Sequence, residues 1–268
     1  MDKLEQPALE SRLLMMAAAC VSEVQFYAVQ DEPLSRAQQR RFYSLVSKRL
    51  AGWPLAYLTC SKEFWSLDFH VFPGVLIPRP ETELLVETVL RLSTHDEETI
   101  VDIGTGCGNI AVSLATELPQ ARIWGTDVSR KALKAARLNA SRHGVHAIHF
   151  IMGSLWDPLE KLGMEGRCDF IVSNPPYVSQ GQWADLERPI KTHEPRTALV
   201  SGETGLESIE KLVAGSPPFL GDRGFLILEI GCGQKDAVLS LFRETWEDIE
   251  VFEDLGGIPR VVKARKKS

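Results

Sequence analysis

The spacing of apolar residues changes along the chain, and each change predicts a different kind of structure. From Glu10 to Tyr27 and from Ser35 to Leu50, apolar residues recur every three or four positions, which predicts two amphipathic helices. Ser35 is a suitable N-cap for the second helix, and Leu50 is the last residue of its apolar stripe. Between 62 and 72, aromatic and polar residues nearly alternate, which favours a hairpin or an extended linker. Helical spacing returns from Leu84 to Leu92, where Thr82 or the acids after Pro80 can open the helix.

From Glu98 onward, short apolar runs alternate with helical periods, which is typical of a parallel sheet with helices on both faces. The predicted strands are 99–103, 121–127, 147–153, 169–173, 224–230, 249–253 and 260–264, and the predicted helices lie near 109–118, 129–142, 206–214 and 234–244. Residues 254–259 are too few for a crossover helix, so the last strand should run antiparallel. We therefore expect an α/β fold with seven strands. We expect the chain to divide into a helical domain at 1–58, a hairpin linker at 59–80 and the sheet domain at 81–268.

A glycine-rich loop follows the first predicted strand, with Gly104, Gly106 and Gly108 at alternate positions. Glycine lets the backbone turn tightly and approach a ligand, and the helix that follows offers free N–H groups. The spacing G-x-G-x-G differs from the dinucleotide fingerprint G-x-G-x-x-G. The next predicted strand ends at Asp127, whose carboxylate can accept hydrogen bonds from both hydroxyls of a ribose. This pattern resembles motif I of the Rossmann-like S-adenosylmethionine (SAM) methyltransferases, and a glycine-rich turn without a ligand is the alternative.

The predicted strand 169–173 is followed by Asn174, Pro175, Pro176 and Tyr177. Ligands of open α/β sheets bind at the carboxyl ends of the strands, so Asn174 should lie beside the glycine loop. An amide nitrogen is a poor nucleophile because its lone pair is delocalised, and two acceptors that hold both of its N–H groups can orient it for attack. The side-chain carbonyl of Asn174 and the main-chain carbonyl of Pro175 can be these acceptors, because the prolines hold the turn rigid. Tyr177 can cover a planar amide or base.

These four residues are the candidate substrate site, and Asn174, Pro175 and Tyr177 are the catalytic candidates. A loop without function is the alternative for the tetrapeptide taken alone.

Composition narrows the classes of function. The 268 residues carry a formal net charge of −6, which suits a duplex phosphate backbone poorly, so no direct nucleic-acid substrate is expected. The 5 cysteines include no C-x-x-C pair and the 6 histidines form no cluster, so neither a metal site nor a disulfide framework is expected. The apolar run from Leu13 to Val21 is too short to span a bilayer. Acids at Asp2, Glu5 and Glu10 disfavour a signal peptide, so we expect a cytoplasmic protein without a membrane partner.

Six segments stand in the order in which one protein family carries them: Pro54–Tyr57, Ile77–Glu83, Gly104–Gly108, Asn174–Tyr177, Glu194–Leu199 and Gly256–Val261. They resemble the HemK/PrmC-type protein-(glutamine-N5) methyltransferases, which modify the glutamine of the Gly-Gly-Gln loop in peptide chain release factors. The segment Ile77–Glu83 is the most specific, since generic methyltransferases lack it. The resemblance implies a class I SAM methyltransferase sheet with strand order 3-2-1-4-5-7-6. It also implies an N-terminal helical domain that helps to hold the release factor.

The resemblance also implies the cofactor site and the partners. By position, SAM would lie along Gly104, Thr105, Gly106, Cys107, Gly108, Asp127, Trp156 and Asn174. Trp156 would pack near the adenine, with a plain core position as the alternative. The implied product is S-adenosylhomocysteine, and the implied partners are class I release factors.

Two features depart from the family pattern. Cys60 stands where the family usually has glycine, and the helical region is short, which bears on substrate docking. Other functions stay open. An N6-adenine methyltransferase uses a similar Asn-Pro-Pro-Tyr turn but should carry a basic target-recognition region. A glutamine methyltransferase of another translation protein is a further alternative. A non-catalytic binding partner is the last, and it should have lost Asn174 or the glycine loop.

Overall fold

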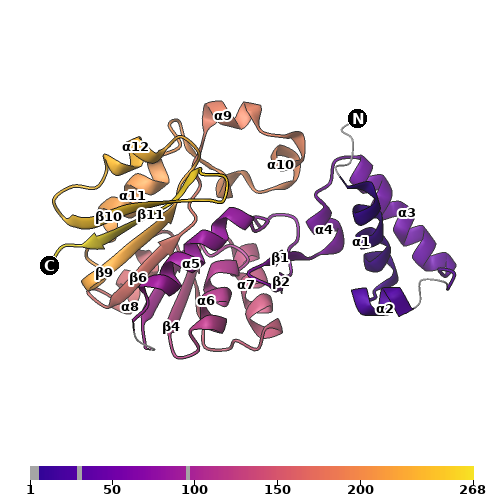
Figure 1. Ribbon diagram of the computed structural model, residues 1–268, viewed down its shortest axis with the longest axis horizontal. Helices are drawn as coiled ribbons and strands as arrows, with labels where there is room; N and C mark the ends of the chain where they lie inside the picture. The colour runs from indigo at the N-terminus through magenta and orange to yellow at the C-terminus, as the bar shows by residue number, and fades with distance from the viewer. Residues whose placement is uncertain (1–5, 29–31, 95–96) are drawn as a thin grey trace.

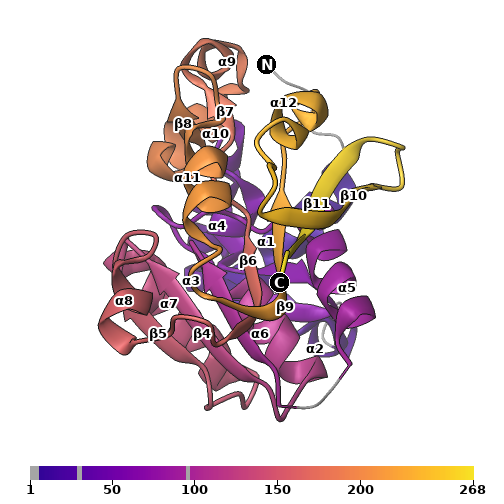
Figure 2. The ribbon, with the colours of Figure 1, turned by 90° about the vertical axis from the view of Figure 1, so that its left-hand side faces the viewer.

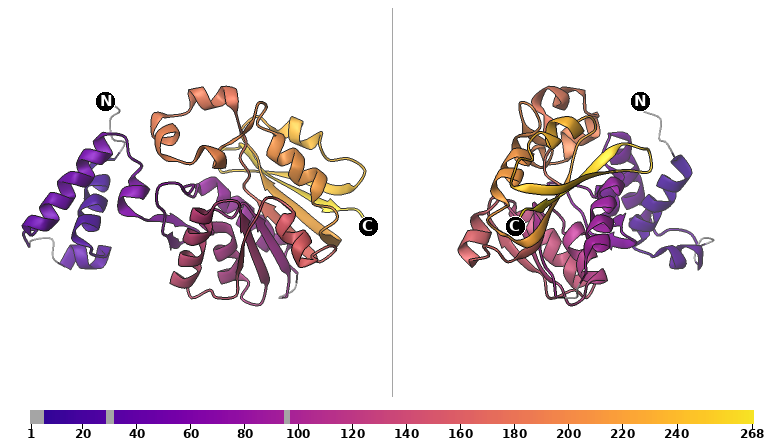
Figure 3. Two further views of the ribbon diagram at one scale, coloured as in Figure 1. Left: turned by 180° about the vertical axis from the view of Figure 1, so that it is seen from behind. Right: turned by 60° about the vertical axis from the view of Figure 1, so that its left-hand side comes forward.

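The computed structural model describes residues 6–28, 32–94 and 97–268. Four helices come first in the chain: α1 (Pro7–Ala19), α2 (Glu23–Ala28), α3 (Arg36–Leu50) and α4 (Leu55–Thr59). They lie at one end of the molecule, apart from the sheet and its helices (Figures 1 and 3). Within the described ranges, no helix combines the length and the apolar character that a bilayer span requires.

The prediction of one helix from Glu10 to Tyr27 was wrong, because the chain breaks at Cys20. Cys20 has a left-handed backbone with φ 59° and closes α1 by donating its N–H to the Met16 carbonyl. Ser22 then opens α2, since its hydroxyl accepts the Gln25 N–H at 3.3 Å while the Gln25 side chain accepts the Ser22 N–H at 2.8 Å. The Ser-x-x-Gln spacing was therefore a better guide here than the apolar period.

The predicted bounds of α3 were correct, since the helix begins after Ser35 and ends at Leu50, but the predicted apolar stripe does not extend to Leu50. Ser35 caps the helix through a reciprocal pair of hydrogen bonds with Gln38. Leu50 is 71% exposed, so it does not belong to a packed stripe. A polar contact helps to join α3 to α1, because the Arg49 guanidinium holds both carboxylate oxygens of Glu10 at 2.6 and 2.9 Å.

The predicted hairpin is present, with β1 (Lys62–Phe64) antiparallel to β2 (Leu67–Phe69). Trp65 and Ser66 form its two-residue turn with φ values of 52° and 56°, as a type I′ turn requires. Cys60 precedes the hairpin at φ 56°, a conformation that glycine adopts without strain. The backbone at this position therefore has a form that suits glycine, although a cysteine occupies it.

All seven predicted strands are present in one sheet: β3 (Thr99–Ile103), β4 (Arg122–Asp127), β5 (His149–Met152), β6 (Cys168–Ser173), β9 (Leu220–Glu229), β10 (Trp246–Glu253) and β11 (Pro259–Lys266). Their order is β5-β4-β3-β6-β9-β11-β10, which is the order 3-2-1-4-5-7-6 that the family resemblance implied. β11 runs antiparallel to both of its neighbours, whereas the other pairs are parallel. The α/β class with an antiparallel last strand is confirmed (Figure 1).

Each face of the sheet has its own buried cluster, because successive residues of a strand point to opposite faces. Ile100 belongs to one cluster and Val101 to the other. The first face is covered by η1 (Pro80–Thr82), α5 (Glu83–Leu92), α6 (Asn109–Glu117) and α7 (Arg130–Arg142); the second is covered by α8 (Asp157–Leu162), α11 (Glu207–Gly215) and α12 (Lys235–Leu239). The prediction of a helix over 234–244 was too long. Phe242 turns inward after α12 and packs edge-on against Trp246, which takes the chain out of the helical path.

One excursion between β6 and α11 was not predicted. β7 (Val178–Ser179) pairs in parallel with β8 (Val200–Gly202), and between them lie α9 (Gln180–Asp185), α10 (Arg188–His193) and η2 (Arg196–Ala198). Figure 2 shows this excursion at the top of the view, beyond the ends of the sheet strands. It reaches the N-terminal helical region through His193, whose ring lies 4.4 Å from that of Trp53, measured between centroids.

Candidate active site

The glycine loop joins β3 to α6 and is hydrogen-bonded to the neighbouring strand. The Gly104 N–H donates to the Thr126 carbonyl at 2.8 Å. Gly104, Gly106 and Gly108 have φ values of 77°, 58° and 83°, which residues with side chains rarely adopt. A Cβ at Gly108 would approach the Ala136 Cβ to 3.0 Å, whereas a Cβ at Gly104 would meet nothing within 4 Å. The loop is therefore packed against α7 at its helix end and borders open space at its strand end.

Asp127 ends β4 beside this loop, where the sequence predicts it. Its Oδ2 accepts the Gly106 N–H at 3.0 Å, and its Oδ1 accepts the Ser129 N–H at 2.7 Å. Burial raises the pKa of Asp127, and these backbone hydrogen bonds act in the opposite direction. The carboxylate is thus held in one orientation, and each oxygen keeps a second lone pair for a ligand hydroxyl. Its contact with a ribose stays a prediction.

A second carboxylate, Asp102, lies in β3 just before the loop and is completely buried. Burial raises the pKa of Asp102 to about 7, although the nearby Thr105 hydroxyl and Ala111 N–H favour the charged form. Among the described residues, no group meets the geometry of a hydrogen bond with either Asp102 oxygen or with the Thr105 hydroxyl. Buried polar atoms normally have partners. Asp102 and Thr105 are therefore buried polar groups beside the glycine loop whose partners are missing among the described residues.

Cys107 is buried in the loop, and burial raises the pKa of its thiol to about 12. Its carbonyl accepts a hydrogen bond from Asn139 Nδ2 at 2.9 Å. The same asparagine accepts the His70 N–H at 2.7 Å and donates to the His70 carbonyl at 3.1 Å. Asn139 therefore joins α7, the glycine loop and the segment after the hairpin. The sequence interpretation missed it, although a polar residue at a core-facing position of a predicted helix is a usable signal.

Two adjoining pockets lie at the carboxyl ends of β3 and β6. The first is lined by the glycine loop, and the second is lined by Pro175 and Tyr177. Leu76, Arg79 and Asn174 line both pockets. The structure therefore brings the two predicted motifs together, with Asn174 in the wall that the pockets share. Pro176 is half-buried beside them and is not among the residues that line these two pockets.

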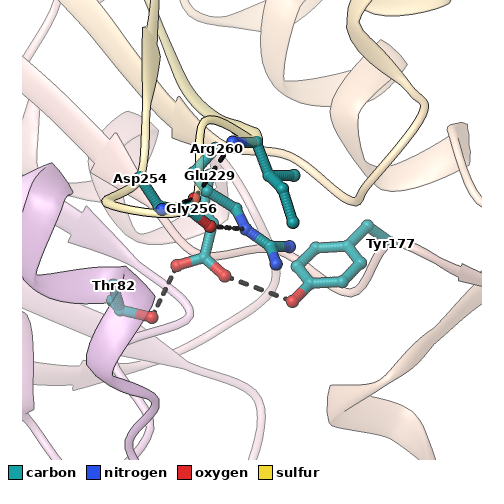
Figure 4. Close-up of polar contacts among 7 residues, drawn as sticks. Thr82, Tyr177, Glu229, Asp254, Gly256 and Arg260 are labelled. Atoms are coloured by element: carbon teal, nitrogen blue, oxygen red, sulfur yellow. Dashed lines mark hydrogen bonds and ion pairs between the residues drawn. The ribbon is translucent and has the colours of Figure 1, made fainter.

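A buried hydrogen-bonded network joins Thr82, Tyr177 and Glu229 (Figure 4). Thr82 Oγ1 donates to Glu229 Oε2 at 2.5 Å, and the Tyr177 hydroxyl donates to Glu229 Oε1 at 3.2 Å. Asn174 Nδ2 in turn donates to Thr82 Oγ1 at 3.0 Å. Burial raises the pKa of Tyr177 well above its ordinary value and raises that of Glu229 to about 7. Asn174 is therefore held by its amide nitrogen, which leaves its carbonyl oxygen on the side of the pockets.

The sequence interpretation missed Glu229 and gave Thr82 a different role. Thr82 does stand at the start of α5, but its side chain makes no capping hydrogen bond there. Its hydroxyl donates a hydrogen bond to Glu229 instead. Glu229 ends β9 within the apolar run 227–230 and is 1% exposed. A carboxylate inside a buried strand, at the end of the sheet that carries Asn174, is the signal that could have found it.

Arg79 and Glu194 join two of the family segments across the pockets. The Arg79 guanidinium lies 2.5 Å from Glu194 Oε1, and the Ile77 N–H donates to Glu194 Oε2 at 3.2 Å. The Glu194 side chain is nearly inaccessible to solvent. The loop before α5 is therefore fixed to the loop after α10, and Arg79 is held where it lines both pockets.

Trp156 has the contacts of a core residue. Its ring stacks on Phe219 with centroids 5.3 Å apart, and its indole nitrogen fills the space where a Cβ on Gly215 would lie. It packs against the cluster on the second face of the sheet. Its predicted contact with an adenine stays a prediction.

The fold and the pocket pair define a class I SAM methyltransferase, and solved structures share this fold. A methyltransferase from Pyrococcus furiosus superposes with a TM-score of 0.57 at 18% identity, over 84% of this chain and 99% of that chain. The ribosomal protein L11 methylase of Lactobacillus delbrueckii subsp. bulgaricus gives 0.53 at 20% identity, over 74% and 84%. The family model of the methyltransferase small domain matches residues 79–192, and that of the PrmC N-terminal domain matches residues 2–59.

The chain belongs to the release factor glutamine methyltransferase family. It is 39% identical to the release factor glutamine methyltransferase of Geobacter sulfurreducens, over 98% of this chain and 90% of the relative. The enzyme of the same description from Moorella thermoacetica is also 39% identical, over 98% and 93%. At this identity and coverage, the family resemblance seen in the sequence is confirmed.

Proposed function

We propose that this protein transfers the methyl group of SAM to the side-chain amide nitrogen, N5, of the glutamine in the Gly-Gly-Gln loop of class I release factors. The observation that carries the proposal is the position of Asn174 in the wall between the two pockets, held by its amide nitrogen. The release factors enter through the descriptions of the relatives. We assign the protein to the cytoplasm, where release factors act.

When bound, SAM supplies an electrophilic methyl group and leaves as S-adenosylhomocysteine. The glycine loop would hold it in the first pocket, and Asp127, beside the loop, would accept the hydroxyls of its ribose. In the second pocket, the carbonyl oxygens of Asn174 and Pro175 accept the two N–H groups of the glutamine amide and aim its nitrogen at the methyl carbon. Tyr177 supports the flat face of the amide. No residue has to remove a proton before transfer, because the proton can leave the nitrogen after it has gained the methyl group.

The reaction as proposed needs no metal ion. Within the described part of the chain, no group of three or more His, Cys, Asp and Glu side chains could hold one. Catalysis depends on positioning of the glutamine nitrogen and the methyl carbon. Positioning can supply a large part of a rate enhancement when the reacting atoms are held about 3–3.5 Å apart.

We assign docking of the release factor to helices α1–α4. They stand beside the excursion that carries α10, and the segment after α10 supplies Ala198 and Leu199 to the second pocket. A protein held by these helices would present its loop to Asn174. If so, KM for an intact release factor should be far below KM for a short Gly-Gly-Gln peptide, while kcat differs less. Equal KM values would count against this docking role.

The experiment that tests the function is incubation with SAM followed by tandem mass spectrometry of the acceptor. The acceptors are an intact release factor, the same factor with its loop glutamine changed to alanine, and DNA that contains adenine. We expect one methyl group on the loop glutamine and none on the other two acceptors. Methylation that persists without the glutamine, or that favours the DNA, would overturn the proposal in favour of another translation protein or an N6-adenine activity.

A further inference from the structure

The hydrogen bonds behind Asn174 form a chain with a defined direction. A carboxylate has no proton to give, so an ionised Glu229 only accepts. Thr82 has one hydroxyl proton, and at 2.5 Å from Glu229 Oε2 that proton is committed to the carboxylate. The oxygen of Thr82 can then only accept from Asn174, and Asn174 can meet it only with its NH₂ group.

The two orientations of the Asn174 amide have opposite consequences in the pocket. With NH₂ toward Thr82, the carbonyl oxygen faces the substrate and can accept an N–H of the glutamine amide. With the amide turned over, an NH₂ group would face the substrate NH₂, and two donors would oppose each other. Turning the amide would also leave Thr82 without its donor in a site where Thr82 is 1% exposed.

We propose that Thr82 and Glu229 are positioning residues for methyl transfer, with ionised Glu229 fixing the direction of the hydrogen-bond chain that turns the Asn174 carbonyl toward the substrate amide. This inference rests on the proposed function of the site. It gives the Ile77–Glu83 segment a role in the reaction, because Thr82 of this segment contacts both Asn174 and Glu229. These two residues lie 92 and 147 positions away along the chain. Glu229 touches neither pocket, so it acts only through Thr82 and Tyr177.

The surroundings of Glu229 allow its ionisation to change near neutral pH. Burial raises the pKa of Glu229 to about 7, and Glu81 on η1 acts in the same direction. Arg260 on β11 and the hydroxyls of Thr82 and Tyr177 favour the charged form. Figure 4 shows Arg260 beside this group, paired with Asp254 at 2.8 Å. When Glu229 gains a proton, it can donate to the Thr82 oxygen, so the Thr82 proton is free to meet the carbonyl of a turned Asn174 amide.

The first test changes the hydroxyl of Thr82. Thr82→Val keeps the shape of the side chain and removes the hydroxyl, so kcat for an intact release factor should fall roughly tenfold to a hundredfold, as loss of alignment does. KM and the affinity for SAM should change much less. Thr82→Ser restores the hydroxyl and should recover most of kcat. Thr88→Val is the matched control, because Thr88 is also buried, on the following helix α5, but donates to the Leu84 carbonyl at 2.6 Å.

The second test follows kcat with pH at saturating substrates. The wild-type kcat should decline as the pH falls through about 7, because Glu229 becomes protonated. Glu229→Gln cannot ionise, so this decline should disappear and kcat should stay low throughout.

The outcomes of these two tests separate the positioning role from the proposed function. If the wild type methylates the release factor and Thr82→Val keeps the wild-type kcat, or the decline with pH survives in Glu229→Gln, the positioning role is refuted while the proposed function stands. A fall in kcat that Thr82→Ser does not recover would also refute it. If the wild type does not methylate the glutamine at all, the proposed function itself has failed.

Discussion

The two pockets of the site are assembled in different ways. On the cofactor side, the contact that shapes the glycine loop is local: the loop and Asp127 belong to consecutive strands, and the contact between Gly106 and Asp127 spans 21 residues. The substrate side is assembled over long range, since Asn174 depends on Thr82, 92 residues away, and on Glu229 behind it. A local loop can serve any methyltransferase with this fold. The long-range network requires the segment before α5 and is therefore tied to the chemistry of one family.

The largest expected effect comes from breaking the substrate side at its centre. Asn174→Ala removes one of the two acceptors that orient the glutamine nitrogen, so turnover should fall by roughly a hundredfold or more. The affinity for SAM should change little, because the glycine loop is left intact. Single-turnover kinetics with saturating SAM and calorimetry measure the two quantities. A parallel loss of both would show that the two sides are not separate.

Asn174→Asp sharpens the same comparison. The new carboxylate keeps an acceptor for the substrate, but it also competes with Glu229 for the single proton of Thr82. We expect a variant that binds SAM well, because it adds a negative charge near the sulfonium, and that transfers the methyl group slowly. The same two measurements apply, and turnover close to that of the wild type would contradict the account of the network.

Breaking the cofactor side should give the reverse pattern. Asp127→Ala removes a charged acceptor for the ribose and frees the N–H groups of Gly106 and Ser129. Affinity for SAM should fall by about ten- to a hundredfold or slightly more, roughly 1.5–3 kcal/mol. At saturating SAM the turnover should recover to near the wild-type value. Unchanged SAM affinity in calorimetry, or tight binding of NAD by the wild type, would contradict the assignment of Asp127 to the ribose of SAM.

Within the glycine loop, substitutions at Gly108 and Gly104 should have different effects. Gly108→Ala places a Cβ 3.0 Å from Ala136 at a positive φ, so the free energy of unfolding should fall by about 1–3 kcal/mol. Gly104→Ala meets no atom and should cost only the conformational strain, about 1–2 kcal/mol. Its methyl group would instead enter the cofactor pocket and weaken SAM binding. Denaturant titration and calorimetry separate the two, and an equal stability loss with unchanged SAM affinity would contradict this reading of the loop.

The same division explains what the sequence could predict. The glycine loop, Asp127 and Asn174 were found because each lies in a short motif after a strand with a clear apolar pattern. Glu229 and Asn139 were missed because their partners are distant in the chain and nothing near them in sequence marks their role. The helix ends were set by particular residues, Cys20 and Phe242, whose turn or burial overrode the helical period.

The last prediction concerns the dependence of stability on pH. Asp102 has its pKa raised to about 7 by burial, against about 3.9 for an ordinary aspartate, so the folded state binds its proton more tightly. Its contribution to the free energy of unfolding should therefore be greatest at low pH and be lost as the pH rises from about 4 to about 7. Asp102→Asn should gain stability relative to the wild type across that window. Chemical denaturation at several pH values measures it, and a constant difference would contradict the assignment.

The central claim is that Asn174 faces a glutamine amide with its carbonyl oxygen while the glycine loop holds the cofactor. A crystal structure with S-adenosylhomocysteine and a peptide that contains Gly-Gly-Gln tests this most directly. The account predicts the glutamine nitrogen within hydrogen-bond distance of Asn174 Oδ1 and the Pro175 carbonyl, with Asn174 Nδ2 still on Thr82. A glutamine bound elsewhere, or an Asn174 that has released Thr82 to reach the substrate, would contradict it.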